Sequence, residues 1–217
     1  MTTAQTEATF STVLRERTAD DHRGAETSRF MSALLDGSLP AEGYADMLAQ
    51  HAYAYAALES PSAAIAEDPV VQPFLHPGLL RTAALEADLE DLAGADWRST
   101  YPASPATERY VARLREVGSD WPGGYVAHHY TRYLGDLSGG QYIGRVAYRT
   151  YDLSPEHGGR FPVFEGLGDL REFKDAYRAS LDAAPWDTEE QVRIVEEIRE
   201  AYRLNGDVFT DLERHVA

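Results

Sequence analysis

Apolar residues recur at intervals of three and four along almost the whole chain, and this spacing limits the possible folds more than any other feature of the sequence. Tyr44, Leu48, His51, Tyr55 and Leu58 illustrate it, because residues at these intervals share one face of a helix. Sustained alternation of apolar and polar residues, which would indicate a half-buried strand, is hard to find. The 217 residues are 43% apolar, enough for one substantial core. The sequence therefore predicts a single all-α domain.

The ends of the predicted helices carry recognisable signals. Ser104 followed by Pro105 is typical of an N-cap and a first helical turn, and Gly94 is a good C-terminal signal. Thr188 with Gln191 matches a capping box. With these signals, we predict helices over 10–27, 44–60, 79–92, 105–118, 125–151, 170–181 and 188–209. No linker or repeat divides the chain, so we expect one domain over residues 1–217, with residues 1–9 as a flexible N-terminus.

The charge and the amino-acid composition exclude several classes of function. The 20 basic and 36 acidic residues give a net charge of −16, which argues against a general nucleic-acid binder. Any anionic ligand must be held by a few local cations. The absence of cysteine excludes disulfides, iron–sulfur clusters and cysteine nucleophiles. The chain shows no secretory signal and no apolar run approaching about 18 residues, so we expect a cytoplasmic protein without a membrane span.

The least ordinary segment is Tyr130–Gln141, which lies inside a helical pattern yet contains three glycines. Gly135, Gly139 and Gly140 together cost about 3 kcal/mol of helix propensity relative to alanine. Tertiary contacts or a ligand must offset this cost. Close helix–helix packing is one interpretation, and a helix bent over a flat ligand is the other. Asp136, a carboxylate among the glycines, slightly favours a wet pocket, but these residues alone leave both interpretations open.

The first predicted helix offers a possible metal ligand. His22 and Glu26 are four residues apart and share a face with Arg15. A histidine oriented by an acid, beside a cation, could ligate a metal whose organic cofactor carries carboxylates. Taken alone, this pattern fits an ordinary exposed helix face better. None of the seven histidines follows a glutamate by three positions, which disfavours a carboxylate-bridged di-iron site.

Taken together, these two segments resemble the haem oxygenases. The similarity is carried by Thr18-x3-His22-x3-Glu26-x4-Met31, Tyr130-x-Arg-Tyr-Leu-Gly-Asp-Leu-Ser-Gly-Gly-Gln141, Phe173-Lys174-x2-Tyr177-Arg178 and Asn205-x3-Phe209. It extends from about Thr12 to Leu212. The glycine segment is the specific signal, and the chain is most similar to the soluble bacterial members.

The resemblance implies a role for each matching position. His22 corresponds to the proximal ligand of the haem iron, and Glu26 to the acid near its outer nitrogen. Asp136 corresponds to the distal carboxylate that organises water, within a kinked distal helix formed at Gly135, Gly139 and Gly140. The positions that hold the haem propionates correspond to Arg15, Tyr130, Lys174 and Arg178. The distal hydrogen-bond network corresponds to Tyr55, Arg132 and Asn205. Pocket-lining positions correspond to Met31, Phe209 and Tyr202, the last of which is phenylalanine in many relatives.

The reaction that the resemblance implies is oxygen-dependent opening of haem to biliverdin, carbon monoxide and ferrous iron. A ferric hydroperoxide attacks a meso carbon, and haem b is both cofactor and substrate. The implied partners are dioxygen and an electron donor, either a ferredoxin or a flavodoxin-type reductase. A basic patch for the donor is suggested at Arg109, Arg113 and Arg115, and we expect a monomer.

Three alternatives remain at this stage. The first is a non-catalytic haem carrier or sensor on the same fold, against which Asp136 and the three glycines argue. The second is the thiaminase-like branch of the fold class, whose enzymes use a cysteine nucleophile that this chain lacks. The third is a helical interaction domain, which would leave the remaining matches as coincidence. The physiological role is open between iron acquisition, haem detoxification and bilin supply.

Overall fold

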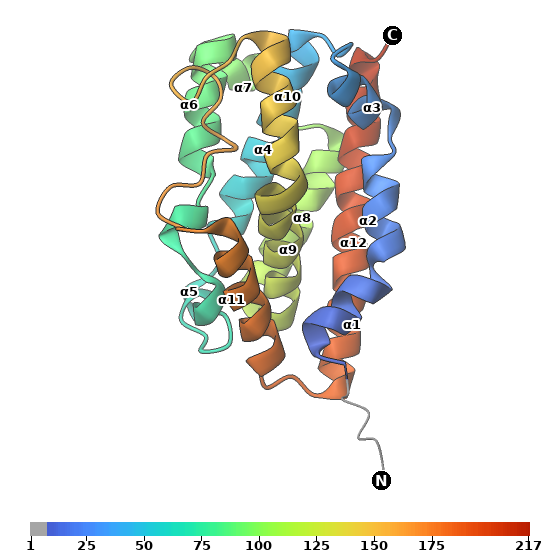
Figure 1. Cartoon of the computed structure of the whole chain (residues 1–217), viewed down its shortest axis with the longest axis vertical. Coiled ribbons are helices and arrows are strands. Elements are labelled where there is room, and N and C mark those ends of the chain that lie inside the picture. The colour runs from blue at the N-terminus through green and yellow to red at the C-terminus, as the bar shows by residue number, and fades with distance from the viewer. Residues whose placement is uncertain (1–7) are drawn as a thin grey trace.

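The computed structural model describes residues 8–217, apart from the side chains of Ala25 and Glu26, and shows a helical domain (Figure 1). No strand occurs within these residues. The longer helices are α1 (Phe10–Arg17), α2 (Ala19–Glu26), α3 (Arg29–Asp36), α4 (Ala41–Leu58), α6 (Thr82–Ala93), α8 (Pro105–Asp120), α9 (Pro122–Gly135), α10 (Gln141–Tyr151), α11 (Leu170–Ala183) and α12 (Thr188–Leu212). The short elements are α5 (Ala63–Ala66), α7 (Trp97–Thr100), the 3₁₀ turns η1 (Gln72–Phe74), η2 (Pro77–Leu79) and η4 (Glu213–His215), and the π-helical turn η3 (Asp136–Gly140). The flexible N-terminus expected for residues 1–9 lies largely outside the described residues.

One predicted helix is interrupted, and one predicted helix cap is wrong. The first helix is interrupted at Thr18, whose backbone (φ −110°, ψ 9°) leaves the helical region and separates α1 from α2. The Thr18 hydroxyl donates to the carbonyl of Leu14 at 2.9 Å, a local bond that competes with regular helix geometry. The last helix is capped by Asp187, whose carboxylate accepts from the backbone NH of Glu190, so Thr188 is the first helical residue and not the cap.

The helices pack around one continuous core. The longest helix, α12, lies against α2, α8 and α9, while α4 packs against α6 and α8. Fully buried apolar side chains from these helices interlock, among them Leu14, Leu48, Leu85, Leu114, Val126 and Ile198. In Figure 1 the run α9–η3–α10 stands in the centre of the view and α2 lies to its right. Across residues 8–217, no helix has both the length and the apolar character needed to span a membrane.

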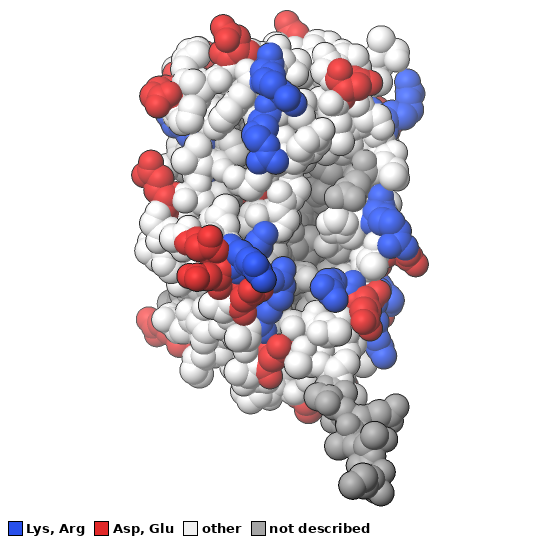
Figure 2. Space-filling view, in the orientation of Figure 1, with Lys and Arg blue, Asp and Glu red and all other residues white. Residues whose placement is uncertain are grey.

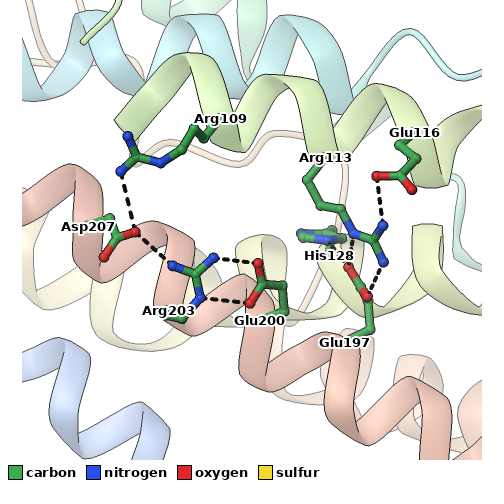
Figure 3. Close-up of polar contacts among 8 residues, drawn as sticks. All are labelled: Arg109, Arg113, Glu116, His128, Glu197, Glu200, Arg203 and Asp207. Atoms are coloured by element: carbon green, nitrogen blue, oxygen red, sulfur yellow. Dashed lines mark hydrogen bonds and ion pairs between the residues drawn. The ribbon is translucent and has the colours of Figure 1, made fainter. Parts of the chain in front are cut away.

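A buried ion network ties α8 to α12 and α9 (Figure 3). Glu197 is only 5% exposed, and its carboxylate accepts from the Arg113 guanidinium at 2.8 and 2.5 Å. The ring Nε2 of His128, which is fully buried, lies 2.8 Å from the same carboxylate. Further out along the same two helices, a chain of ion pairs joins Arg109, Asp207, Arg203 and Glu200. The network therefore stabilises the packing of the longest helix.

This network predicts an acid-dependent contribution to stability. Burial raises the pKa of Glu197, but the bonds from Arg113 and His128 outweigh burial and lower it to about 2, below its ordinary value of 4.5. A pKa that is lower in the folded state favours folding above pH 4.5, and the contribution is lost as the pH falls towards 2. We expect Glu197→Gln to reduce the free energy of unfolding at pH 7 by about 1–3 kcal/mol. Urea titrations at pH 7 and near pH 2.5 check this, and an equal cost at both values would contradict it.

Candidate active site

A cleft opens between α2 on one side and the run α9–η3 on the other. It consists of two adjoining cavities of about 330 and 140 Å³, which share His22, Thr131, Gly135 and Tyr202. The outer cavity is lined from α1, α2, α9, η3, α11 and α12, and the inner cavity also from α3, α4 and α10. Figure 2 shows the corresponding face, on which lysine and arginine side chains gather around a hollow. An acidic protein therefore carries a locally basic cleft.

The glycine segment forms one wall of the cleft. At η3 the helix widens into a π turn, a geometry often found at functional sites. A Cβ atom added at Gly135 or Gly139 would meet nothing within 4 Å, so both residues face open space. At Gly140 an added Cβ would lie 3.4 Å from the Cβ of Asp136. Of the two interpretations of the glycines, the open space favours a backbone that approaches a ligand over helix–helix packing.

Filling this space tests the role of the glycine wall. We expect Gly139→Leu to lower the affinity for the cleft's ligand at least tenfold, because its side chain would project into the cleft. The apo-protein should keep its thermal stability, since no neighbour lies within 4 Å and leucine is a better helix former than glycine. Gly24→Leu, at an exposed helical glycine with equally open surroundings, is the matched control. Hemin titration of both variants checks the prediction, which fails if Gly139→Leu binds as the parent does.

His22 lies on the opposite wall, in the middle of α2. It lines both the outer and the inner cavity, and the Tyr202 ring of α12 meets its imidazole edge-on at a centroid distance of 5.8 Å. The cleft thus has a histidine on one side and bare glycine backbone on the other. The predicted partner of the histidine, the Glu26 carboxylate, lies outside the described side chains.

A polar network stands beside the glycine wall. The Tyr55 hydroxyl donates to the Asp136 carboxylate, and Arg132 donates to the Asn205 side-chain oxygen at 2.8 Å. The guanidinium of Arg132 lies 4.7 Å from the centre of the Tyr55 ring. Its Nε and Nη2 atoms are buried without a hydrogen-bond partner among the described residues. The three residues predicted for the network therefore lie together with Asp136.

The surroundings of Asp136 shift its pKa upwards. Burial raises the pKa of Asp136 above its ordinary value, while the Arg132 charge and the hydrogen bond from Tyr55 oppose the rise. Burial also raises the pKa of Tyr55, so the phenol stays neutral and donates.

Cationic side chains surround the outer end of the cleft. Arg15, Tyr130 and Arg178 line it, and Arg178 is also paired with Asp175 at 2.8 Å. Lys174 is not among the residues that line the outer cavity, and its ammonium group donates to the Leu137 carbonyl and the Ser138 hydroxyl, both at 3.1 Å. Three of the four predicted anion-holding residues thus line the cleft, and Lys174 instead supports η3.

The inner end is mostly apolar. Met31 and Phe209 line it as predicted, together with Tyr202, and Phe209 stacks on Phe30 at 5.8 Å. Several other residues that line the two cavities had no predicted role, among them His51, Thr131, Ser138 and Ile143. His51 occupies a position in the apolar stripe of its helix, where a histidine is most often a core residue, so the sequence pattern did not distinguish it.

The cleft fits a flat, metal-containing macrocycle with carboxylate arms. It offers one histidine on one wall, bare backbone on the other, an apolar inner end and arginines at the mouth. Haem b has the matching parts, since its iron takes an imidazole ligand and its propionates take cations. The fold and the cleft therefore define a helical haem-binding protein.

Comparison with known proteins identifies the family. A family model described as heme oxygenase matches residues 8–211. Heme oxygenase 1 of Gallus gallus is 38% identical over 96% of this chain and 71% of its own length. The heme oxygenase-1 of the cyanobacterium Synechocystis, solved in complex with heme, superposes with a TM-score of 0.89 and 34% identity, covering 95% of this chain and 93% of that one. The heme oxygenase of Leptospira interrogans gives a TM-score of 0.88 and 34% identity, covering 94% and 100%. The chain belongs to the heme oxygenase family, and its function is that of a haem oxygenase.

Proposed function

We propose that this chain binds haem b in the cleft between α2 and α9–η3, with His22 as the iron ligand, and opens the ring to biliverdin, carbon monoxide and ferrous iron. The observation that carries the proposal is the arrangement of the two walls, which sets His22 opposite Gly135 and Gly139 with Asp136 beside them. Haem supplies the iron at which dioxygen is reduced, and its own ring is the substrate. The protein contributes placement and a proton.

The charged side chains at the mouth of the cleft set the position of haem. Arg15, Arg178 and Tyr130 hold the propionates, and the charge-assisted bonds fix the in-plane rotation of the ring. Lys174 acts by holding η3 through Leu137 and Ser138, within reach of the same end of the cleft. Met31, Phe209 and Tyr202 enclose the apolar edge. Glu26 orients the imidazole of His22 from its outer nitrogen.

Proton supply rests on Asp136. Its carboxyl group holds a water molecule beside the reacting face of haem, and Tyr55 fixes the carboxyl group by donating to it. Arg132, held by Asn205, keeps a positive charge next to this pair. Proton transfer through a positioned water suits this reaction, because a direct strong acid would favour wasteful cleavage of the O–O bond. Gly135, Gly139 and Gly140 would let the helix backbone lie close to the face of haem. This close backbone would restrict oxidation to one edge of the haem ring.

Electrons come from a ferredoxin or a flavodoxin-type reductase, and the protein acts as a cytoplasmic monomer of one domain over residues 1–217. The suggestion of a donor patch at Arg109, Arg113 and Arg115 is weakened, because two of these arginines are engaged within the chain. Arg109 pairs with Asp207 and Arg113 with Glu197, as Figure 3 shows.

Measuring the reaction products distinguishes a haem oxygenase from a non-catalytic haem carrier or sensor. Purified protein reconstituted with hemin, given dioxygen and a reductase system, should release one carbon monoxide for each haem consumed, as trapped by ferrous myoglobin. Catalase in the mixture removes free peroxide, which also bleaches haem. Bound haem that releases no carbon monoxide under these conditions would favour the carrier.

A further inference from the structure

A small inner chamber adjoins the cleft behind Asp136. It has a volume of about 50 Å³ and shares six lining residues with the inner cavity, namely Met31, His51, Asp136, Gly140, Ile143 and Phe209. The remaining walls come from Tyr44, Met47, Gly144, Phe161 and Pro162. The chamber is therefore a recess on the Asp136 side of the cleft.

The walls of the chamber are apolar except at three side chains. Tyr44, His51 and Asp136 are the only lining residues whose side chains carry nitrogen or oxygen. A purely apolar recess of this size would stay dry, whereas a buried water needs two or more polar partners and about 10–15 Å³. The chamber satisfies both conditions, and two of its polar groups also border the cleft.

His51 is fixed in a position to serve as one of these partners. It is 8% exposed and sits on α4 one turn before Tyr55, so the two side chains lie on the same face of the helix. Its ring meets Phe161 edge-on at 5.8 Å and lies 6.4 Å from Phe209. Burial, followed by the charge of Arg132, lowers the pKa of His51 well below its ordinary value. The imidazole is therefore neutral, with one nitrogen that donates and one that accepts.

We propose that His51 is a positioning residue for the reaction, whose imidazole holds a water molecule in the inner chamber against the carboxyl group of Asp136. The hydrogen-bond network beside the cleft then continues from Tyr55 and Asp136 into the chamber. This inference rests on the proposed function, in which Asp136 holds water beside haem.

The physical reason for such a residue lies in the poor hydration of the chamber. Asp136 is partly exposed, and on the chamber side most of the lining is apolar, so a water that carries protons to and from its carboxyl group has few partners there. A neutral imidazole that donates to the backbone carbonyl of Met47 keeps one ring nitrogen that can accept from this water without adding a charge. Leucine at the same position would leave an apolar wall next to the carboxyl group and remove a partner of the water.

The test uses the hemin-bound protein and two variants at one position. His51→Leu removes both ring nitrogens, and His51→Gln keeps a donor and an acceptor. Crystal structures of the ferric hemin complexes should show a water within hydrogen-bond distance of both His51 and Asp136. The water should be absent in His51→Leu and present in His51→Gln.

A second readout is the affinity of the ferric hemin complex for azide, an anion stabilised by hydrogen bonds from the distal water. We expect His51→Leu to weaken azide binding about three- to tenfold, the factor of one hydrogen bond. His51→Gln should remain within twofold of the parent. Met47→Leu, which alters the same wall without removing a nitrogen or oxygen atom, should also remain within twofold.

The outcomes separate this inference from the proposed function. A chamber without water in the parent complex, or azide affinity of His51→Leu within twofold of the parent, would overturn the role of His51. Neither result bears on haem cleavage, which is measured by biliverdin formation in the parent protein. A parent that binds no hemin would instead overturn the proposed function, on which the inference depends.

Discussion

Asp136→Ala keeps haem in the cleft and loses biliverdin formation by about 100-fold or more, the size expected when a positioned proton-transfer group is removed. Haem binding survives because the iron ligand and the propionate partners lie on other elements, at His22, Arg15 and Arg178. Biliverdin formation falls because the water beside the reacting face loses its anchor. The turnover that remains should shift towards peroxidase-like chemistry.

The measurement pairs two assays on the hemin complex. Biliverdin is followed by its visible absorption, and peroxidase-like activity by oxidation of guaiacol with hydrogen peroxide. Asp120→Ala, at an exposed carboxylate at the end of α8, is the matched control and should behave as the parent does in both assays. Undiminished biliverdin formation by Asp136→Ala would contradict the proton-relay role.

His22→Ala should lose the spectrum of five-coordinate, histidine-ligated ferrous haem, and its turnover should fall below detection. The physical reason is that His22 lines both cavities opposite the glycine wall, where the iron of a flat ligand would lie. Hemin can still enter the cleft, since its apolar edge and its propionates keep their partners. Added imidazole should occupy the space left by the side chain and restore the ferrous spectrum.

The matched control for this variant is His157→Ala. His157 lies in the loop before α11, with its side chain 66% exposed and 3.5 Å from Asp91, so its removal should leave the ferrous spectrum unchanged. Resonance Raman spectroscopy of the ferrous complex detects the iron–histidine stretch directly. A His22→Ala variant that retains this band without added imidazole would refute the ligand assignment.

Much of the fold was predictable because it depends on local periodicity. The three- and four-residue spacing correctly predicted α4, α6, α8 and α11, and the Ser104–Pro105 start of α8 was confirmed by the Ser104 cap. The interruption at Thr18 was not predictable, since threonine tolerates a helix interior and the break depends on its own hydroxyl bond to Leu14. Likewise, Asp187 and not Thr188 caps the last helix. The spacing of apolar residues does not distinguish between two neighbouring polar residues as the cap.

The candidate site was predictable where a motif specified it. The glycine segment signalled a distorted helix, and the structure has a π turn there with open space at Gly135 and Gly139. The contacts between distant segments were not readable from spacing alone. Tyr55 and Asp136 are 81 residues apart in the sequence. Only the packing of α4 against the run α9–η3 brings the two side chains together.

Residues outside the motifs were missed for a different reason. His51 lies on the apolar stripe of α4, where a histidine most often serves as a core residue, so its place between the cleft and the inner chamber required the three-dimensional arrangement. Lys174 matched a motif, yet its ammonium group binds two residues of η3, Leu137 and Ser138. A motif identifies the residue, while the packing decides which atom it contacts.

The visible spectrum of the hemin-reconstituted protein, followed in air as a reductant is added with catalase present, tests the central claim most directly. A Soret band typical of histidine-ligated haem should appear on reconstitution, and should then decay while biliverdin absorption grows. A histidine-type Soret band that persists with a competent reductase, or a protein that binds no hemin, would contradict the claim that this cleft holds haem and opens it.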